Sequence, residues 1–373
     1  MAAEAHDLIP EIRRGKIYRD VYEKRSPDRP ALGEAFLERA RAVDGVLDFG
    51  GSGARSRAFR DGVFLLEIPA EIDVSAGDAF ACQFYEGPVA APYGRFRDLG
   101  SDHFGDPLLG FHQRINQIEQ FLLERRFWAG VYPPEITDLG ESLTRLSRQV
   151  LRSVLSAVGI PERDWRRATG GCSQCAGSYH LTFNHYRPAH EDIGLSSHKD
   201  DGFLTILRTT APGLEVSRED HWETVPAEPD CFIVNFGLSM EILTAGSRMP
   251  VAAIMHRVAR QQDDRSSFGH FSSSGCLPGE DEGIYRYVHS GGLERVCGSR
   301  ELIDENDYEI YAGTDAPDRP HTPDSSGSPH SSGAPESPGA PDSPHAPDSP
   351  GGSGTPDAPG RAEGRPIAKD VRR

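Results

Sequence analysis

The sequence predicts a mainly β or α+β protein whose core is a double-stranded β-helix, the jelly roll, with N-terminal helices packed on it. Three observations predict this fold class. In the second half of the chain, short β-rich segments are separated by Gly, Pro, Asp or Ser, a pattern typical of an antiparallel sandwich or barrel. In the first half, apolar residues recur three and four apart over longer segments, as in amphipathic helices. Helices followed by a run of short strands fit a jelly roll with helices on one sheet.

The first 165 residues are predicted to form a mostly helical region that packs on the core. Helices are expected at 31–43, 72–84, 107–127 and 136–160, with one strand at 62–68. The segment 136–160 has the most regular leucine stripe, and Gly159 and Pro161 are stop signals at its end.

The jelly-roll core is predicted to span residues 166–312. Its strands are expected at 178–186, 203–209, 213–216, 230–236, 251–259 and 266–273. Residues 313–373 are dominated by Pro, Ser, Gly, Asp and Ala. Because such a segment has almost nothing apolar to bury, we expect a disordered C-terminal tail.

Composition excludes some classes of partner. The 373 residues carry a net charge of −17, which disfavours nucleic acid and anionic membranes, since both need clustered Lys and Arg. No apolar run is long enough to cross a bilayer or to act as a secretory signal, and six cysteines in so long a chain form no disulfide framework. We therefore expect a cytoplasmic protein that acts on a small molecule, with its oligomeric state open.

Two histidines and an aspartate have the chemistry of a metal site. His198 and Asp200 are separated by one residue, so in an extended segment both side chains leave the same face, while Lys199 points away. His256 follows in an apolar, strand-like segment, where a lone histidine is more often a satisfied core residue. Order, spacing and strand context together favour ligation. Two imidazoles and one carboxylate leave three positions open on an octahedral metal, as in non-heme Fe(II) oxygenases.

An arginine and a serine form a candidate anion clamp nine residues beyond His256. Taken singly, Arg265 fits a surface salt bridge and Ser267 a strand-edge hydroxyl. As a pair two apart on one strand face, they are better explained as a binding site for an acid. A guanidinium binds a carboxylate through two parallel hydrogen bonds, so the pattern predicts a small organic acid near the metal.

Five motifs around these residues occur in a family-specific order. They are NHYRP (184–188), SSHKDDGFLTIL (196–207), GLEVSREDHWETVPAEPDCFIVNFG (213–237), MHRV (255–258) and RSSFGHF (265–271). On these motifs, the segment 178–273 resembles the catalytic core of the Fe(II)- and 2-oxoglutarate-dependent oxygenases, in the subgroup similar to isopenicillin N synthase. The resemblance covers roughly a quarter of the chain. The sequence departs from the family pattern largely at positions where relatives bind substrate, so the resemblance does not identify the substrate.

The resemblance implies roles for seven residues. Fe(II) would be held by His198, Asp200 and His256. The distal carboxylate of 2-oxoglutarate would be bound by Arg265 and Ser267, with Asn184 and Tyr186 helping to hold this cosubstrate. The implied reaction consumes O2, releases succinate and CO2, and oxidises a C–H bond by hydroxylation, desaturation or ring closure, with ascorbate as an added reductant. The expected setting is specialised metabolism, such as antibiotic biosynthesis.

Two other functions stay open at the level of sequence. An isopenicillin N synthase-like oxidase would use the same three ligands without 2-oxoglutarate, and its Arg265–Ser267 pair would bind a substrate carboxylate. A non-catalytic jelly-roll binding protein with a structural metal is less favoured, because a closed structural site would want a fourth protein ligand.

Overall fold

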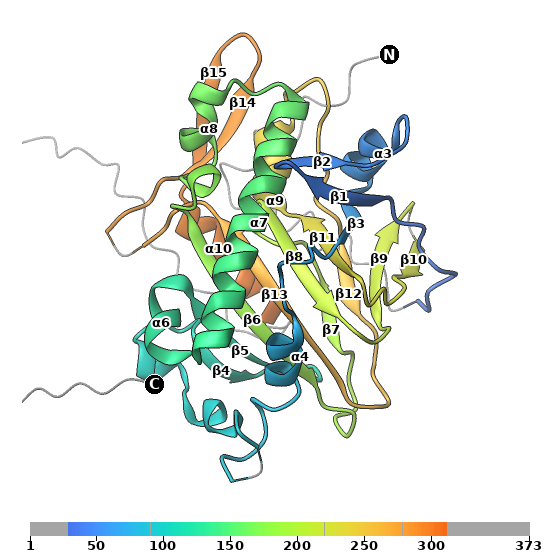
Figure 1. The fold of residues 1–373 in the computed structure, drawn as a ribbon, viewed down its shortest axis with the longest axis vertical. Helices are drawn as coiled ribbons and strands as arrows, with labels where there is room; N and C mark the ends of the chain where they lie inside the picture. Colours follow the sequence, from blue (N-terminus) through green and yellow to red (C-terminus); the bar gives the residue numbers. More distant parts are fainter. Residues whose placement is uncertain (1–28, 90, 220, 278, 312–373) are drawn as a thin grey trace, which may run out of the picture. The chain divides into compact units, whose positions relative to one another are not determined.

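The computed structural model describes residues 29–311 except 90, 220 and 278 (Figure 1). All described residues belong to the first of the two units into which the chain divides, residues 1–317. The predicted tail at 313–373 lies outside the described residues. Within the described ranges, no helix is both long enough and apolar enough to cross a membrane.

A nine-stranded sheet organises this unit. Its strands, in spatial order, are β2 (Val46–Asp48), β1 (Arg39–Val43), β3 (Val63–Glu67), β11 (Cys231–Phe236), β8 (Leu204–Thr209), β13 (Arg265–Ser273), β6 (Ser178–Tyr186), β5 (Ile118–Glu124) and β4 (Gly110–Gln113). All neighbours are antiparallel except β1 and β3.

A four-stranded sheet faces the large one. Its order is β10 (His221–Thr224), β9 (Leu214–Arg218), β12 (His256–Val258) and β7 (Leu195–His198). One apolar cluster contains Ile118, Tyr186 and Ile233 from the large sheet together with Leu214 and Val258 from the small one. The two sheets therefore enclose a shared interior, as in a jelly roll. A separate hairpin pairs β14 (Ile284–Val288) with β15 (Gly292–Cys297).

Helices cover the other face of the large sheet. The longest, α7 (Pro134–Val158), lies across the sheet in Figure 1, and α4 (Ser75–Ala81) packs beside it. A second apolar cluster joins both helices to the outward-facing residues of β6, which include Leu181 and Phe183. The remaining helices are α3 (Ala54–Asp61), α5 (Ser101–Phe104), α6 (Trp128–Val131), α8 (Glu162–Ala168), α9 (Leu238–Thr244) and α10 (Ser299–Tyr311), with short 3-10 turns η1 (Gly94–Asp98), η2 (Arg125–Phe127) and η3 (Cys172–Gln174).

The jelly-roll fold class is confirmed, and so are the helix predicted at 136–160 and the strand predicted at 62–68. The helix predicted at 107–127 is wrong, because this segment forms β4 and β5 and extends the large sheet. The helix predicted at 31–43 is also wrong: its last residues form β1. β4 and β5 pair with each other as a hairpin, and β5 also pairs with the more distant β6. β1 pairs with the neighbouring β2 and with β3. The division of the chain near residues 165 and 312 stays a prediction.

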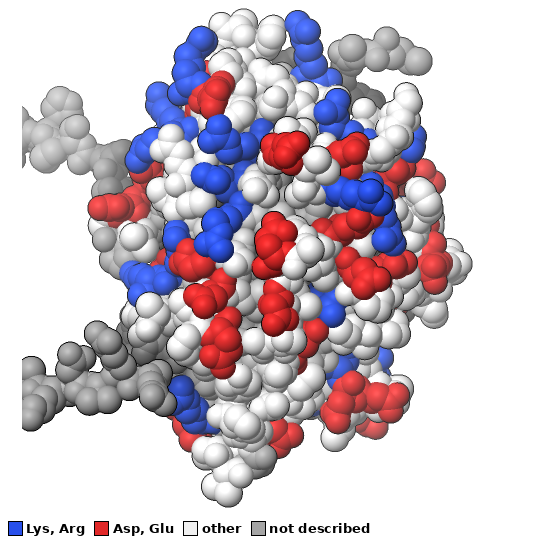
Figure 2. Space-filling view, in the orientation of Figure 1, with Lys and Arg blue, Asp and Glu red and all other residues white. Residues whose placement is uncertain are grey.

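Charge on the face shown in Figure 2 is mixed. Lys and Arg side chains lie among Asp and Glu side chains there. Ion pairs between exposed charges include that of Arg152 with Glu162 at 2.7 Å. Such exposed pairs contribute little to stability.

Candidate active site

Three buried side chains converge between the two sheets. His198 ends β7 and His256 begins β12, and the two residues are direct partners in the small sheet. Asp200 lies two residues beyond β7, and its Oδ1 is 3.7 Å from His198 Nε2 and 3.6 Å from His256 Nε2. Among the described residues, this is the one group of three or more His, Cys, Asp or Glu residues close enough to hold a metal ion.

Backbone contacts set the tautomer of both histidines. His198 Nδ1 is 2.8 Å from the Ser196 carbonyl, and His256 Nδ1 is 3.2 Å from the Ile254 carbonyl. A carbonyl only accepts, so each Nδ1 carries the proton and each Nε2 keeps its lone pair toward Asp200. This is the arrangement by which metal-binding histidines are oriented in proteins. The donor set therefore fits a divalent ion with two nitrogen ligands and one oxygen ligand.

A threonine that sequence reasoning missed orients the carboxylate. Thr205 Oγ1, on β8, donates a 2.6 Å hydrogen bond to Asp200 Oδ2. Lys199 points away from the cluster, as predicted, and its Nζ pairs with Glu241 at 3.1 Å. Asn306 of α10 donates to the Lys199 carbonyl at 3.0 Å. Lys199, between the two ligands, is thus held through both its side chain and its carbonyl.

Arg265 is a buried cation that lacks a carboxylate partner among the described residues. It begins β13, and its side chain donates only to neutral acceptors, the Pro212 carbonyl at 2.9 Å and Thr209 Oγ1 at 3.1 Å. Its Nη1 is buried without a hydrogen-bond partner. Because an uncompensated buried charge is costly, this guanidinium fits an anionic ligand that would supply the missing acceptor.

The other three residues named from the sequence surround Arg265. Tyr186 is its cross-strand partner on β6, with the guanidinium 4.7 Å from the ring centroid. Ser267 lies opposite Asn184, whose Nδ2 donates to Ser267 Oγ at 3.4 Å. Gln120 on β5, which sequence reasoning did not single out, donates to Asn184 Oδ1 at 3.0 Å. A continuous polar row therefore crosses three strands beside the arginine.

A cavity of about 130 Å³ connects much of this arrangement. The three candidate ligands, Asn184 and Tyr186 line it, whereas Arg265 and Ser267 are not among its lining residues. Tyr186, the neighbour of Arg265, forms the wall on that side. Beyond the candidate ligands the wall includes Leu108, Leu122, His180, Phe271 and Ile303.

Comparison with known proteins finds a family whose model matches this part of the chain. The model of the 2OG-Fe(II) oxygenase superfamily matches residues 178–274. This segment is therefore similar to the members of that superfamily. The match contains all seven residues named from the sequence, and the isopenicillin N synthase-like subgroup is consistent with it. Members of the superfamily use Fe(II), 2-oxoglutarate and O2, and the His198–Asp200–His256 cluster fits the iron.

Similar proteins of the superfamily include plant enzymes. The chain is 28% identical over 204 residues to the chloroplastic 2-oxoglutarate-dependent dioxygenase 21 of Oryza sativa subsp. japonica, covering 52% of this chain and 54% of that protein. It is 34% identical over 151 residues to jasmonate-induced oxygenase 2 of Arabidopsis thaliana, covering 38% of this chain and 39% of that protein. The chain thus spans about half or less of the length of these curated relatives.

A solved structure shares the fold. The crystal structure of JOX2 in complex with 2OG, Fe and JA matches with a TM-score of 0.50 and 23% identity, covering 69% of this chain and 82% of JOX2. At this identity the likeness shows the jelly-roll fold and not the substrate.

Proposed function

We propose that this protein is an Fe(II)- and 2-oxoglutarate-dependent dioxygenase that oxidises a C–H bond of a small molecule. The outcome would be hydroxylation, desaturation or ring closure, with release of succinate and CO2. The observation that carries the proposal is the pairing of two sites in one interior. One is the buried cluster whose two Nε2 atoms lie 3.6 and 3.7 Å from a single Asp200 oxygen. The other is buried Arg265, whose Nη1 has no hydrogen-bond partner.

In this proposal His198, Asp200 and His256 hold Fe(II), and Arg265 with Ser267 binds the distal carboxylate of 2-oxoglutarate. Asn184 and Tyr186 form the wall along which this cosubstrate lies. Bound Fe(II) and 2-oxoglutarate together supply the O2-dependent oxidation. The chain's own residues provide position: Thr205 fixes the Asp200 carboxylate, and the Ser196 and Ile254 carbonyls hold the two imidazoles in one tautomer. The apolar side chains of the cavity wall keep water from the reacting centre.

The biological setting is proposed more broadly. One relative is named a 2-oxoglutarate-dependent dioxygenase and the other a jasmonate-induced oxygenase, and these names support the proposed type of reaction. We propose a role in specialised metabolism, such as antibiotic biosynthesis, at a cytoplasmic location, although one relative carries a chloroplastic name. Ascorbate would serve as an added reductant.

Anaerobic titration with Fe(II), with and without 2-oxoglutarate, tests the proposal directly. We expect a charge-transfer absorption band when both are present, and succinate release when O2 is admitted. No band with 2-oxoglutarate and no succinate, together with O2 consumption on a substrate alone, would instead support the isopenicillin N synthase-like oxidase. Absence of the band and of succinate would defeat the proposal.

Asp200→Ala should remove metal binding and turnover, because it deletes the one anionic ligand. Asp201→Ala changes the adjacent carboxylate, which accepts from Ser273 at 3.3 Å and is not in the cluster, and should keep Fe(II) binding. Metal affinity measured under nitrogen distinguishes the two variants. Equal Fe(II) affinity for wild type and Asp200→Ala would contradict the assignment of the ligands.

Arg265→Ala should weaken 2-oxoglutarate binding while Fe(II) still binds, because the cluster itself is unchanged. Loss of a buried charge-assisted contact costs about 2–5 kcal/mol, which corresponds to an affinity lower by about 30-fold or more. The dissociation constant for 2-oxoglutarate, followed by the charge-transfer band, measures this. Unchanged 2-oxoglutarate affinity in the variant would exclude the clamp.

A further inference from the structure

The interior face of β6 has a chemical gradient along its length. His180, Thr182, Asn184 and Tyr186 alternate along this strand and all line the cavity. Tyr186 is the partner of Arg265, so this end belongs to the anion clamp. At about 3.4 Å per residue, His180 lies roughly 14 Å from Asn184 along the strand. His180 therefore stands at the end of the cavity away from the clamp.

Strand register places His180 level with the candidate metal site. His180 is opposite Phe271 on β13, and Phe271 is opposite Thr205 on β8. Two strand spacings separate His180 from Thr205, or about 10 Å. Thr205 holds the Asp200 carboxylate. The width between the imidazole and the candidate metal ligands suits one small molecule.

The wall around His180 is mostly apolar. Leu108, Leu122, Phe271 and Ile303 line the cavity with it. The His180 ring makes no hydrogen bond to any residue in the described part of the chain, although it faces the cavity. A molecule that filled this space would meet aliphatic and aromatic surface and a single imidazole.

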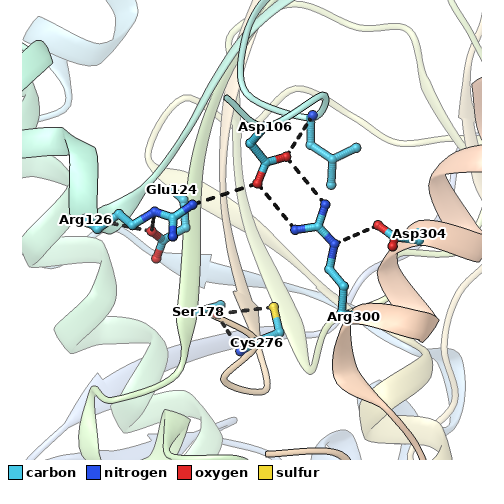
Figure 3. Close-up of polar contacts among 8 residues, drawn as sticks. Asp106, Glu124, Arg126, Ser178, Cys276, Arg300 and Asp304 are labelled. Atoms are coloured by element: carbon cyan, nitrogen blue, oxygen red, sulfur yellow. Dashed lines mark hydrogen bonds and ion pairs between the residues drawn. The ribbon is translucent and has the colours of Figure 1, made fainter. Parts of the chain in front are cut away.

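The charged side chains near His180 form ion pairs with one another (Figure 3). Asp106 Oδ2 and Oδ1 accept from Arg300 Nη1 and Nη2 at 3.4 and 3.5 Å, and Asp106 lies 3.8 Å from Arg126 Nη2. Arg300 also pairs with Asp304 at 2.7 Å, and Arg126 with Glu124 at 3.2 Å. Burial raises the pKa of Asp106, but the Leu108 N–H and Arg300 outweigh it and lower the pKa overall. These two arginines and three carboxylates therefore neutralise most of one another's charge, with one formal negative charge left over among the five.

The imidazole itself is neutral near pH 7. Burial lowers the pKa of His180 to about 4; Asp106 raises it in part, and Arg300 and Arg126 lower it further. A neutral imidazole offers one donor and one acceptor. It suits an uncharged hydroxyl or carbonyl, and it gives a carboxylate no counter-charge.

We propose that His180 is a specificity-determining residue that hydrogen-bonds an uncharged hydroxyl or carbonyl group of an otherwise apolar substrate. The contact orients the substrate so that a C–H bond on its far side faces the candidate metal ligands. This inference rests on the proposed oxygenase function and adds the chemical class of its substrate.

Binding of a matched ring series tests the inference. Cyclohexanone, cyclohexanol, methylenecyclohexane and cyclohexanecarboxylate would be titrated under nitrogen into the full chain loaded with Fe(II) and 2-oxoglutarate, following the charge-transfer band. One net hydrogen bond corresponds to roughly three- to tenfold in affinity. We expect the ketone and the alcohol to bind wild type tighter than the hydrocarbon by this factor.

Variants test whether the His180 side chain causes the preference for the ketone and the alcohol over the hydrocarbon. His180→Phe should bind ketone and hydrocarbon equally, and His180→Gln, which keeps a donor and an acceptor, should retain part of the preference. His270→Gln alters another buried histidine, on the opposite face of β13, and should keep the full preference. Thermal melting checks that each variant is folded.

The outcomes are separable from those of the proposed function. No preference in wild type, a preference that persists in His180→Phe, or tighter binding of the carboxylate than of the ketone would each overturn the inference. Failure of wild type to form the charge-transfer band would instead defeat the oxygenase proposal.

Discussion

At the residue scale, the candidate site depends on contacts that no sequence motif predicts. His198, Asp200, His256 and Arg265 follow from spacing and residue type, because ligand chemistry restricts which side chains are suitable. Thr205 has no such signal, since a threonine in an apolar strand is commonplace. It becomes relevant only because β8 brings its Oγ1 to 2.6 Å from Asp200 Oδ2. Contacts of this kind depend on which strands are neighbours, and that is a property of the folded chain.

Thr205→Val tests this contact, because it replaces the hydroxyl with a methyl group of nearly equal size. Loss of a hydrogen bond to a metal-binding carboxylate typically weakens metal affinity about 10- to 100-fold. We expect this decrease for Fe(II) or Co(II), measured by anaerobic titration, with little change in thermal stability. Thr205→Ser keeps the hydroxyl and should restore most of the affinity. Wild-type affinity in Thr205→Val would show that Asp200 is held by other contacts.

At the element scale, α7 packs closely against the Trp128 ring because residue 140 is a glycine. A Cβ added at Gly140 would lie 2.6 Å from Trp128 Cζ3, within a buried and rigid ring. At Gly130 in α6, a Cβ would meet nothing within 4 Å. The two glycines are both helical, so intrinsic propensity acts on them alike and packing distinguishes them.

Gly140→Ala should lower the free energy of unfolding although alanine favours helix. Overpacking of a close contact costs about 1–3 kcal/mol, which exceeds the gain of at most about 1 kcal/mol from helix propensity. Gly130→Ala, the matched control, should leave stability unchanged or raise it by up to about 1 kcal/mol. Urea unfolding followed by circular dichroism measures both. A stabilised Gly140→Ala would mean that Trp128 moves aside at little cost.

Prediction from sequence succeeds for elements whose apolar residues follow a regular helical or strand period. It fails where pairing with strands elsewhere in the sheet determines the secondary structure. The leucine stripe of α7 faces one apolar layer, so its period is visible in the sequence. The segment 118–124 forms β5, which lies between β6 and β4 and is buried along most of its length. With both faces covered, its apolar residues lose the alternation of a half-buried strand. The same covering places the polar Gln120 beside Asn184.

At the scale of the whole molecule, the large sheet separates two interiors of different character. The interior between the sheets holds the candidate site with its buried polar and charged groups. The interior beneath α4 and α7 is aromatic and aliphatic, and His270 is a polar group enclosed in it. Its Nε2 is 2.9 Å from Thr144 Oγ1 of α7, and Nδ1 has no hydrogen-bond partner. The buried His270 should therefore make the stability of this unit depend on pH.

His270 should make the protein less stable as the pH falls below about 6.5, the ordinary pKa of histidine in an unfolded chain. Burial lowers its pKa in the fold to about 3, with smaller lowering by the charges of His180 and Arg125 and an opposing backbone contact. Between these two values the unfolded chain binds a proton that the folded chain does not bind, so the free energy of unfolding decreases as pH falls. One such proton is worth about 1.4 kcal/mol per pH unit, or about 2 kcal/mol from pH 6.5 to 5.

The measurement compares metal-free wild type with His270→Asn by urea unfolding at pH 7.5, 6 and 5. Other titrating groups, including the candidate ligands, are present in both proteins and largely cancel in the difference. Asparagine removes the titration but keeps an amide for Thr144, so wild type should lead at pH 7.5 and lose about 2 kcal/mol of that lead by pH 5. If the difference in the free energy of unfolding between wild type and His270→Asn stays constant with pH, the prediction is wrong. Such a result would show that His270 binds its proton equally well in the folded and in the unfolded chain.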